Sequence, residues 1–142
     1  MALQTATIFG VHSVVFVRRA LVVALGGAIG SVGRYVVGLW AAQAFGATFP
    51  WGTFTVNVVG CLLIGVLATL SDEIGSIGPQ GRALLVVGVL GGFTTFSSFS
   101  LDTVRLVQEN ELVHAAAYVV GSLALSFVAV LAGIGLARAL YR

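Results

Sequence analysis

The chain has 142 residues, of which 58% are hydrophobic and only 8% are charged, and its mean hydropathy is +1.08. Soluble globular domains carry about 25% charged residues, so this composition excludes a soluble domain and predicts an all-α integral membrane protein. The formal net charge of +2 comes from arginine without any basic run, which excludes a nucleic-acid partner, and the single cysteine excludes an intrachain disulfide.

Four membrane spans fit this length, because the hydrocarbon core of a bilayer takes about 20 residues of helix. We therefore predict a single four-span membrane domain over residues 1–142, in a multi-pass protein of the cell inner (plasma) membrane. Four short helices enclose little space, so an oligomer is expected. After an N-terminal tail at residues 1–19, the predicted spans cover about 20–44, 51–70, 82–107 and 112–137.

The first span contains an arginine well inside its apolar sequence. The guanidinium of Arg34 is costly there unless it reaches water or a partner. Two interpretations stay open, an anchor that reaches the membrane interface and a group at the mouth of a pore. Gly26 and Gly30, four residues apart, provide a small surface for close helix packing, although this motif is common in membrane helices.

The second span contains Asn57, whose amide must be satisfied within the membrane. An interhelical hydrogen bond is the ordinary explanation for such a side chain, and a place in a polar path is the alternative. At the start of this span, Pro50 ends the preceding helix and Trp51 suits the headgroup level.

The third span contains the most unusual stretch, residues 91–100, which reads GGFTTFSSFS. Paired glycines and β-branched threonines weaken a helix, so we expect an interruption near the middle of this span, between Gly91 and Thr95. Backbone carbonyls exposed there must be buried in protein, bind an ion or line a polar path. Towards the end of the span, Asp102 and Arg105 are three residues apart and are expected to form a helical ion pair.

The fourth span places three hydroxyl groups at intervals of four residues, on Tyr118, Ser122 and Ser126. At a rise of 1.5 Å per residue they cover about 12 Å, more than a third of the hydrocarbon thickness. A single serine in a membrane helix is usually bonded to its own backbone, but three in register are compatible with a polar track.

The polar groups of the spans are neutral donors, which favours a small anion as their ligand. No acidic residue lies near the centre of a span, and this argues against a cation path and against a proton-coupled exporter. Phe96 and Phe99 share one helical face among the hydroxyls. The edge of an aromatic ring carries the positive end of its quadrupole and can face an anion.

These motifs resemble the small four-span fluoride channels called Fluc or CrcB. The resemblance covers nearly the whole chain from about Leu25. It is carried by GGAIGSVGRY at residues 26–35, GTFTVNVVG at 52–60, the stretch at 91–100 and the three hydroxyls of the fourth span.

The resemblance implies a passive fluoride channel rather than an enzyme, built as an antiparallel, dual-topology homodimer with two pores. It also implies a central structural sodium ion (Na+) held between subunits by the backbone carbonyls of Gly91 and Thr94. The residues it assigns to the fluoride pore are Asn57, Phe96, Phe99, Ser98, Tyr118, Ser122 and Ser126.

Two alternatives remain open. Apart from Arg34, five arginines lie on the side of the termini and one lies on the other side, which favours a single orientation over an even mixture. Because some members of the family pair two oppositely oriented sister chains, a heterodimeric fluoride channel is one alternative. A small four-span multidrug-type exporter is the other, but it resembles this chain only in size and would need a carboxylate within the membrane.

Overall fold

The computed structural model describes the backbone of residues 2–141 and the side chains of residues 14–141. The described part of the chain is all-helical and has no strand. Four of its helical segments are long and apolar enough to cross a membrane: Val14–Phe45, Trp51–Asp72, Pro79–Gln108 and Leu112–Leu140. The predicted all-α, multi-pass membrane protein is thereby confirmed.

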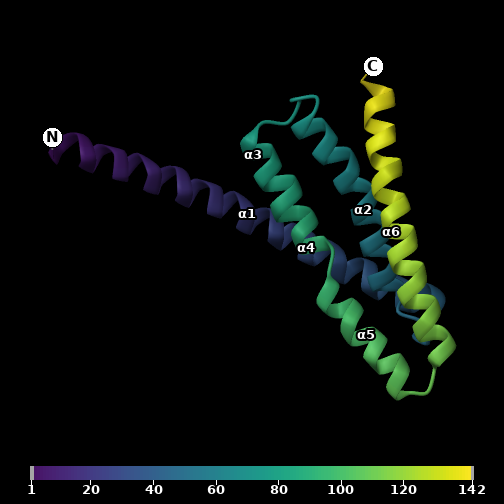
Figure 1. Cartoon of the computed structure of the whole chain (residues 1–142). Helices are drawn as coiled ribbons and strands as arrows, with labels where there is room; N and C mark the ends of the chain where they lie inside the picture. The colour runs from purple at the N-terminus through teal and green to yellow at the C-terminus, as the bar shows by residue number, and fades with distance from the viewer. Residues whose placement is uncertain (1, 142) are drawn as a thin grey trace.

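Helix α1 (Ala2–Phe45) is continuous, so the backbone of residues 2–19, expected as a tail, belongs to the same helix as the first span. At 1.5 Å per residue a helix of this length measures about 66 Å, roughly twice the hydrocarbon core of a bilayer. Its N-terminal part therefore extends beyond the hydrocarbon, and Figure 1 shows this end projecting away from the other helices. The helix ends before Gly46, whose φ of +82° suits glycine.

The third membrane segment is composed of several helical pieces. It begins with α3 (Pro79–Arg82), continues as the π-helix η1 (Ala83–Leu90) and ends its first half with α4 (Gly91–Phe93). Two residues of extended backbone follow and separate this half from α5 (Phe96–Gln108), as the short non-helical link between α4 and α5 in Figure 1 shows.

Helices α2 (Trp51–Asp72) and α6 (Leu112–Leu140) pack together along their lengths. Their backbones touch at glycines. A side chain at Gly65 would collide with the carbonyl of Val130, and one at Gly133 would collide with the carbonyl of Leu62. This is the close approach that small residues permit between membrane helices.

The glycines of the first span also permit a close approach of backbones, here between α1 and the first half of the third segment. Helix α1 packs against η1 and α4, and a Cβ added to Gly88 would lie 2.9 Å from the Cα of Gly26. Gly30 lies against the backbone of Val89 in the same way. The first half of the third segment is therefore held firmly against α1, upstream of the extended residues.

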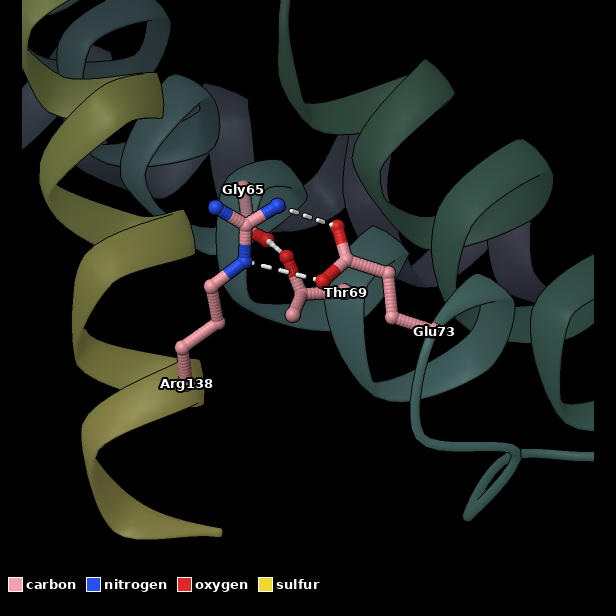
Figure 2. Close-up of polar contacts among 4 residues, drawn as sticks. All are labelled: Gly65, Thr69, Glu73 and Arg138. Carbon is pink, nitrogen blue, oxygen red and sulfur yellow. Dashed lines mark hydrogen bonds and ion pairs between the residues drawn. The ribbon is translucent and has the colours of Figure 1, made fainter. Parts of the chain in front are cut away.

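An ion pair joins the C-terminal ends of α2 and α6. The guanidinium nitrogens Nη2 and Nε of Arg138 donate to the two carboxylate oxygens of Glu73, at 2.7 and 2.8 Å (Figure 2). This hydrogen bonding holds the pKa of the Glu73 carboxyl below its ordinary value. One turn before Glu73, the Thr69 hydroxyl donates to the carbonyl of Gly65 in its own helix, at 2.9 Å (Figure 2).

Candidate functional site

The interruption of the third segment lies at Thr94 and Thr95. Both residues have extended backbone, with ψ angles of 158° and 119°. Thr95 caps the next helix, because its Oγ1 accepts a hydrogen bond of 3.2 Å from the backbone N–H of Ser98. Helix α5 therefore begins at Phe96 with a conventional N-cap, although it begins inside the membrane.

Asn57 of α2 satisfies the open backbone groups of this interruption. Its Nδ2 donates to the carbonyl of Thr95 at 3.1 Å, and its Oδ1 accepts from the backbone N–H of the same residue at 2.8 Å. The interhelical hydrogen bond predicted for this asparagine is confirmed. A side-chain amide matches the peptide group in both donor and acceptor, and it can therefore replace a missing helical neighbour.

The same geometry deprives two carbonyls of their helical donors. In a continuous helix the N–H of Thr95 would bond to the carbonyl of Gly91, but here it bonds to Asn57. Likewise, the N–H of Ser98 would bond to the carbonyl of Thr94 but bonds to the Thr95 hydroxyl. These are the two carbonyls that the family resemblance assigns to a cation.

A pocket of about 190 Å³ lies next to the interruption. Five of the seven residues expected at a fluoride pore line it, together with Cys61 and Leu123: Asn57 of α2, Phe96 and Phe99 of α5, and Ser122 and Ser126 of α6. The sequence placed these residues on three separate spans, and the fold brings them to one cavity.

The walls of this pocket differ in character. The rings of Phe96 and Phe99 lie 5.6 Å apart, and Phe96 is 76% exposed whereas Phe99 is only 9% exposed. The Oγ of Ser122 is buried and has no hydrogen-bond partner among the described residues. A buried hydroxyl without a partner is costly, which marks the pocket as a place where a ligand or water would be bound.

Tyr118 lies outside this pocket. Its ring is fully buried beside Phe99, at a centroid distance of 5.2 Å, and its hydroxyl donates to Asp102 at 3.4 Å. Thr53 donates to the same carboxylate oxygen at 2.8 Å. The predicted helical ion pair of Asp102 with Arg105 is therefore wrong within the described part of the chain, because Asp102 is bound by two hydroxyls and makes no ion pair there.

Ser98 and Arg34 line a second pocket, of about 310 Å³, next to the same interruption. Thr95 and Thr53 contribute to its wall, and Arg34 is half-buried. Arg34 forms no ion pair with any acidic side chain that the structure describes. Its place in the wall of this pocket is compatible with the pore-mouth interpretation, and the pore-mouth and anchor interpretations both stay predictions.

Sequence reasoning missed the bonding of Thr53 and Tyr118 to Asp102. One feature of the sequence could have indicated that Thr53 takes part in the site, because Thr53 and Asn57 are four residues apart and therefore share a face of α2.

Among the described residues, no group of three or more histidine, cysteine and acidic side chains could hold a metal ion. A cation at this site would depend on backbone carbonyls.

Comparison with known proteins agrees with this geometry. Residues 21–134 match the family described as CrcB-like protein, Camphor Resistance (CrcB). The chain belongs to this family. A protein of Rhizobium etli named fluoride-specific ion channel FluC is 52% identical over 122 residues, which cover 86% of this chain and 98% of that protein.

Proteins of other organisms carry the same name. The protein of Rhizobium meliloti is 50% identical over 120 residues, covering 84% of this chain and 96% of its own. That of Opitutus terrae is 53% identical over 115 residues, covering 80% and 87%. These relatives match the chain over nearly their whole lengths.

Proposed function

We propose that this protein is a fluoride-selective passive channel that exports fluoride from the cytoplasm. The observation that carries the proposal is the single pocket in which Asn57, Phe96, Phe99, Ser122 and Ser126 meet. Its polar groups are uncharged, one of its hydroxyls lacks a partner, and its aromatic rings can present their edges to an anion. Membership of a family whose relatives are named fluoride-specific channels supports the same reading.

The physical basis of export is the membrane potential. Hydrogen fluoride crosses membranes as a neutral acid and dissociates inside, so the anion accumulates in the cytoplasm. A negative-inside potential moves one charge outwards with about 2.3 kcal/mol per 100 mV, and a selective pore therefore needs neither ATP nor a proton gradient. Selectivity arises when several donors replace the hydration shell of the small anion at close range.

We further propose that the channel is an antiparallel dimer with two pores. In one chain the Phe96 ring is largely exposed, and the pocket beside it is therefore incomplete on that side. Gly91 is also exposed at the surface. A second, inverted copy packed over these residues would complete each pore and bring two sets of carbonyls together.

The carbonyls of Gly91 and Thr94 fit a structural sodium ion at that contact. Both are deprived of their helical donors, and unwound carbonyls are the groups that bind sodium in other membrane proteins. A bound sodium ion would supply positive charge between the subunits. Gly91 leaves its carbonyl accessible, because no side chain covers it.

Fluoride efflux from liposomes tests the proposal. Purified protein is reconstituted in vesicles loaded with potassium fluoride. A potassium ionophore lets potassium leave with the fluoride, so that no opposing voltage builds up, and an electrode records the released fluoride. We expect rapid fluoride release and no chloride release from matched chloride vesicles. Phe96→Ile, which removes a ring edge, and Asn57→Asp, which adds a negative charge, should slow release by about tenfold or more.

The result that contradicts the proposal is release no faster than from protein-free vesicles. If release then occurs only when a sister chain is added, the heterodimeric form of the channel replaces the homodimer. Equal release of chloride and fluoride by the wild type would contradict the proposed selectivity for fluoride over chloride.

A further inference from the structure

The thiol of Cys61 lies on the wall of the same pocket. Cys61 follows Asn57 by four residues, so the two side chains occupy one face of α2 on successive turns. It is the only cysteine of the chain and it is unpaired.

A second observation shows that this pocket is built to accept a ligand. Ser122, on the facing helix α6, is only 4% exposed, and its Oγ has no partner among the described residues. Ser122 and Cys61 line the pocket from opposite helices, with Ser126 one turn further along α6. A ligand that bonds with Ser122 in this pocket therefore shares the pocket with the sulfur.

We propose that Cys61 is part of the wall of the anion path and that a small, soft electrophile attached to its sulfur closes the path. This inference rests on the proposed function, because it assumes that fluoride moves through the pocket. The pocket holds about 190 Å³, so even a small added group would occupy a substantial part of it. Sulfur is also the softest nucleophile in the pocket, where the other polar groups are hydroxyls and an amide.

The chemistry can be tested with methyl methanethiosulfonate, a small uncharged reagent. The Cys61 thiol loses its proton to water, and the thiolate attacks the divalent sulfur of the reagent's methylthio group. A disulfide forms between Cys61 and the methylthio group. The sulfur–sulfur bond of the reagent breaks, and methanesulfinate leaves with its electron pair. Dithiothreitol reverses the modification by reducing the new disulfide.

The experiment measures fluoride efflux before and after treatment in the same preparation, for three proteins. These are the wild type, Cys61→Ser, and a control that carries both Cys61→Ser and Leu63→Cys. Residue 63 lies two positions along α2, on the other face, and Leu63 is exposed outside the pocket. Mass spectrometry reports which thiols carry the methylthio group.

We expect treatment to slow the wild type by about tenfold, because the added group obstructs a path that must strip and pass a small ion. Dithiothreitol should restore the rate. The ratio of treated to untreated efflux should stay near one for Cys61→Ser and for the labelled control with a thiol at residue 63.

Two results would overturn the inference alone. The first is unchanged efflux from wild type shown to be labelled at Cys61. The second is a Cys61 that stays unlabelled under conditions that label residue 63. If untreated wild type releases no fluoride, the proposed function fails and takes the inference with it, which is a different and recognisable outcome.

Discussion

Asn57→Leu tests the central feature of the site, because the Asn57 side chain closes both open backbone groups of Thr95. Leucine has a similar size and can make neither hydrogen bond. Leaving a buried group unsatisfied costs about 1–3 kcal/mol, whereas side-chain hydrogen bonds in a membrane protein average about 0.6 kcal/mol. Two bonds of 2.8 and 3.1 Å are lost at a buried residue, so we expect the free energy of unfolding to fall by about 1–4 kcal/mol.

Function should suffer more than stability in this variant. Without Asn57, the start of α5 loses both hydrogen bonds to this side chain of α2, and we expect the adjacent Phe96 and Phe99 to shift in the pocket. We expect fluoride efflux to fall by about tenfold or more. Efflux is measured with the fluoride electrode, and stability by the thermal midpoint of tryptophan fluorescence in detergent.

Thr69→Val is the matched control. It removes a buried polar group from the same helix, but the Thr69 hydroxyl bonds only within α2 and lies twelve residues along that helix from Asn57. Its efflux should match the wild type. Equal efflux and equal thermal midpoint for Asn57→Leu and the wild type would refute the role assigned to the Asn57 and Thr95 pairing.

Three further predictions concern single features of the fold and the pocket. Ser122→Ala should slow fluoride efflux while leaving the thermal midpoint unchanged or raised, because it removes a buried hydroxyl that has no partner; a lowered midpoint with full efflux would contradict this. Gly133→Val should destabilise the protein by about 1–3 kcal/mol or more through its collision with the Leu62 carbonyl, whereas Gly135→Val, with open space around it, should be tolerated in the same thermal assay. Glu73→Gln should lower the midpoint at neutral pH. The pKa of Glu73 is lower in the folded protein than in the unfolded chain, so the contribution of this carboxylate to stability is complete above about pH 4.5 and is lost as the pH falls through the folded pKa. A difference in thermal midpoint between Glu73→Gln and the wild type that persists in stronger acid would be inconsistent with the ion pair.

The sequence was sufficient for the class of fold and for five of the residues that line the pocket. Apolar runs of membrane length identify the spans, because the bilayer leaves few other structures available. The uncommon residues inside those runs, Asn57 and the hydroxyls around Phe96, stand out for the same reason. A polar side chain in a membrane helix must have a partner, so its presence already indicates a site.

The directions of individual side chains could not be predicted in this way. Tyr118, Ser122 and Ser126 recur every four residues, but four residues turn a helix by about 40° beyond a full turn. The ridge therefore winds around α6, and only the two serines line the pocket. Tyr118 has a longer side chain and reaches Asp102 instead, a contact that depends on how α5 folds back on α6.

The pairing of Asn57 with Thr95 also links the two ion sites that we propose. As long as Asn57 takes the N–H of Thr95, the Gly91 carbonyl stays free for a cation. In Asn57→Leu the N–H of Thr95 has lost its partner, and any molecules in which it bonds to the Gly91 carbonyl instead would lack one sodium ligand.

Sodium should therefore stabilise the two proteins differently. A ligand that binds only the folded state raises the thermal midpoint. We expect sodium chloride, compared with the chloride of a large organic cation, to raise the midpoint of the wild type, and to raise that of Asn57→Leu by much less. An equal shift in both would mean that the carbonyl freed by the interruption is not a sodium ligand, and that Asn57 acts on the anion path alone.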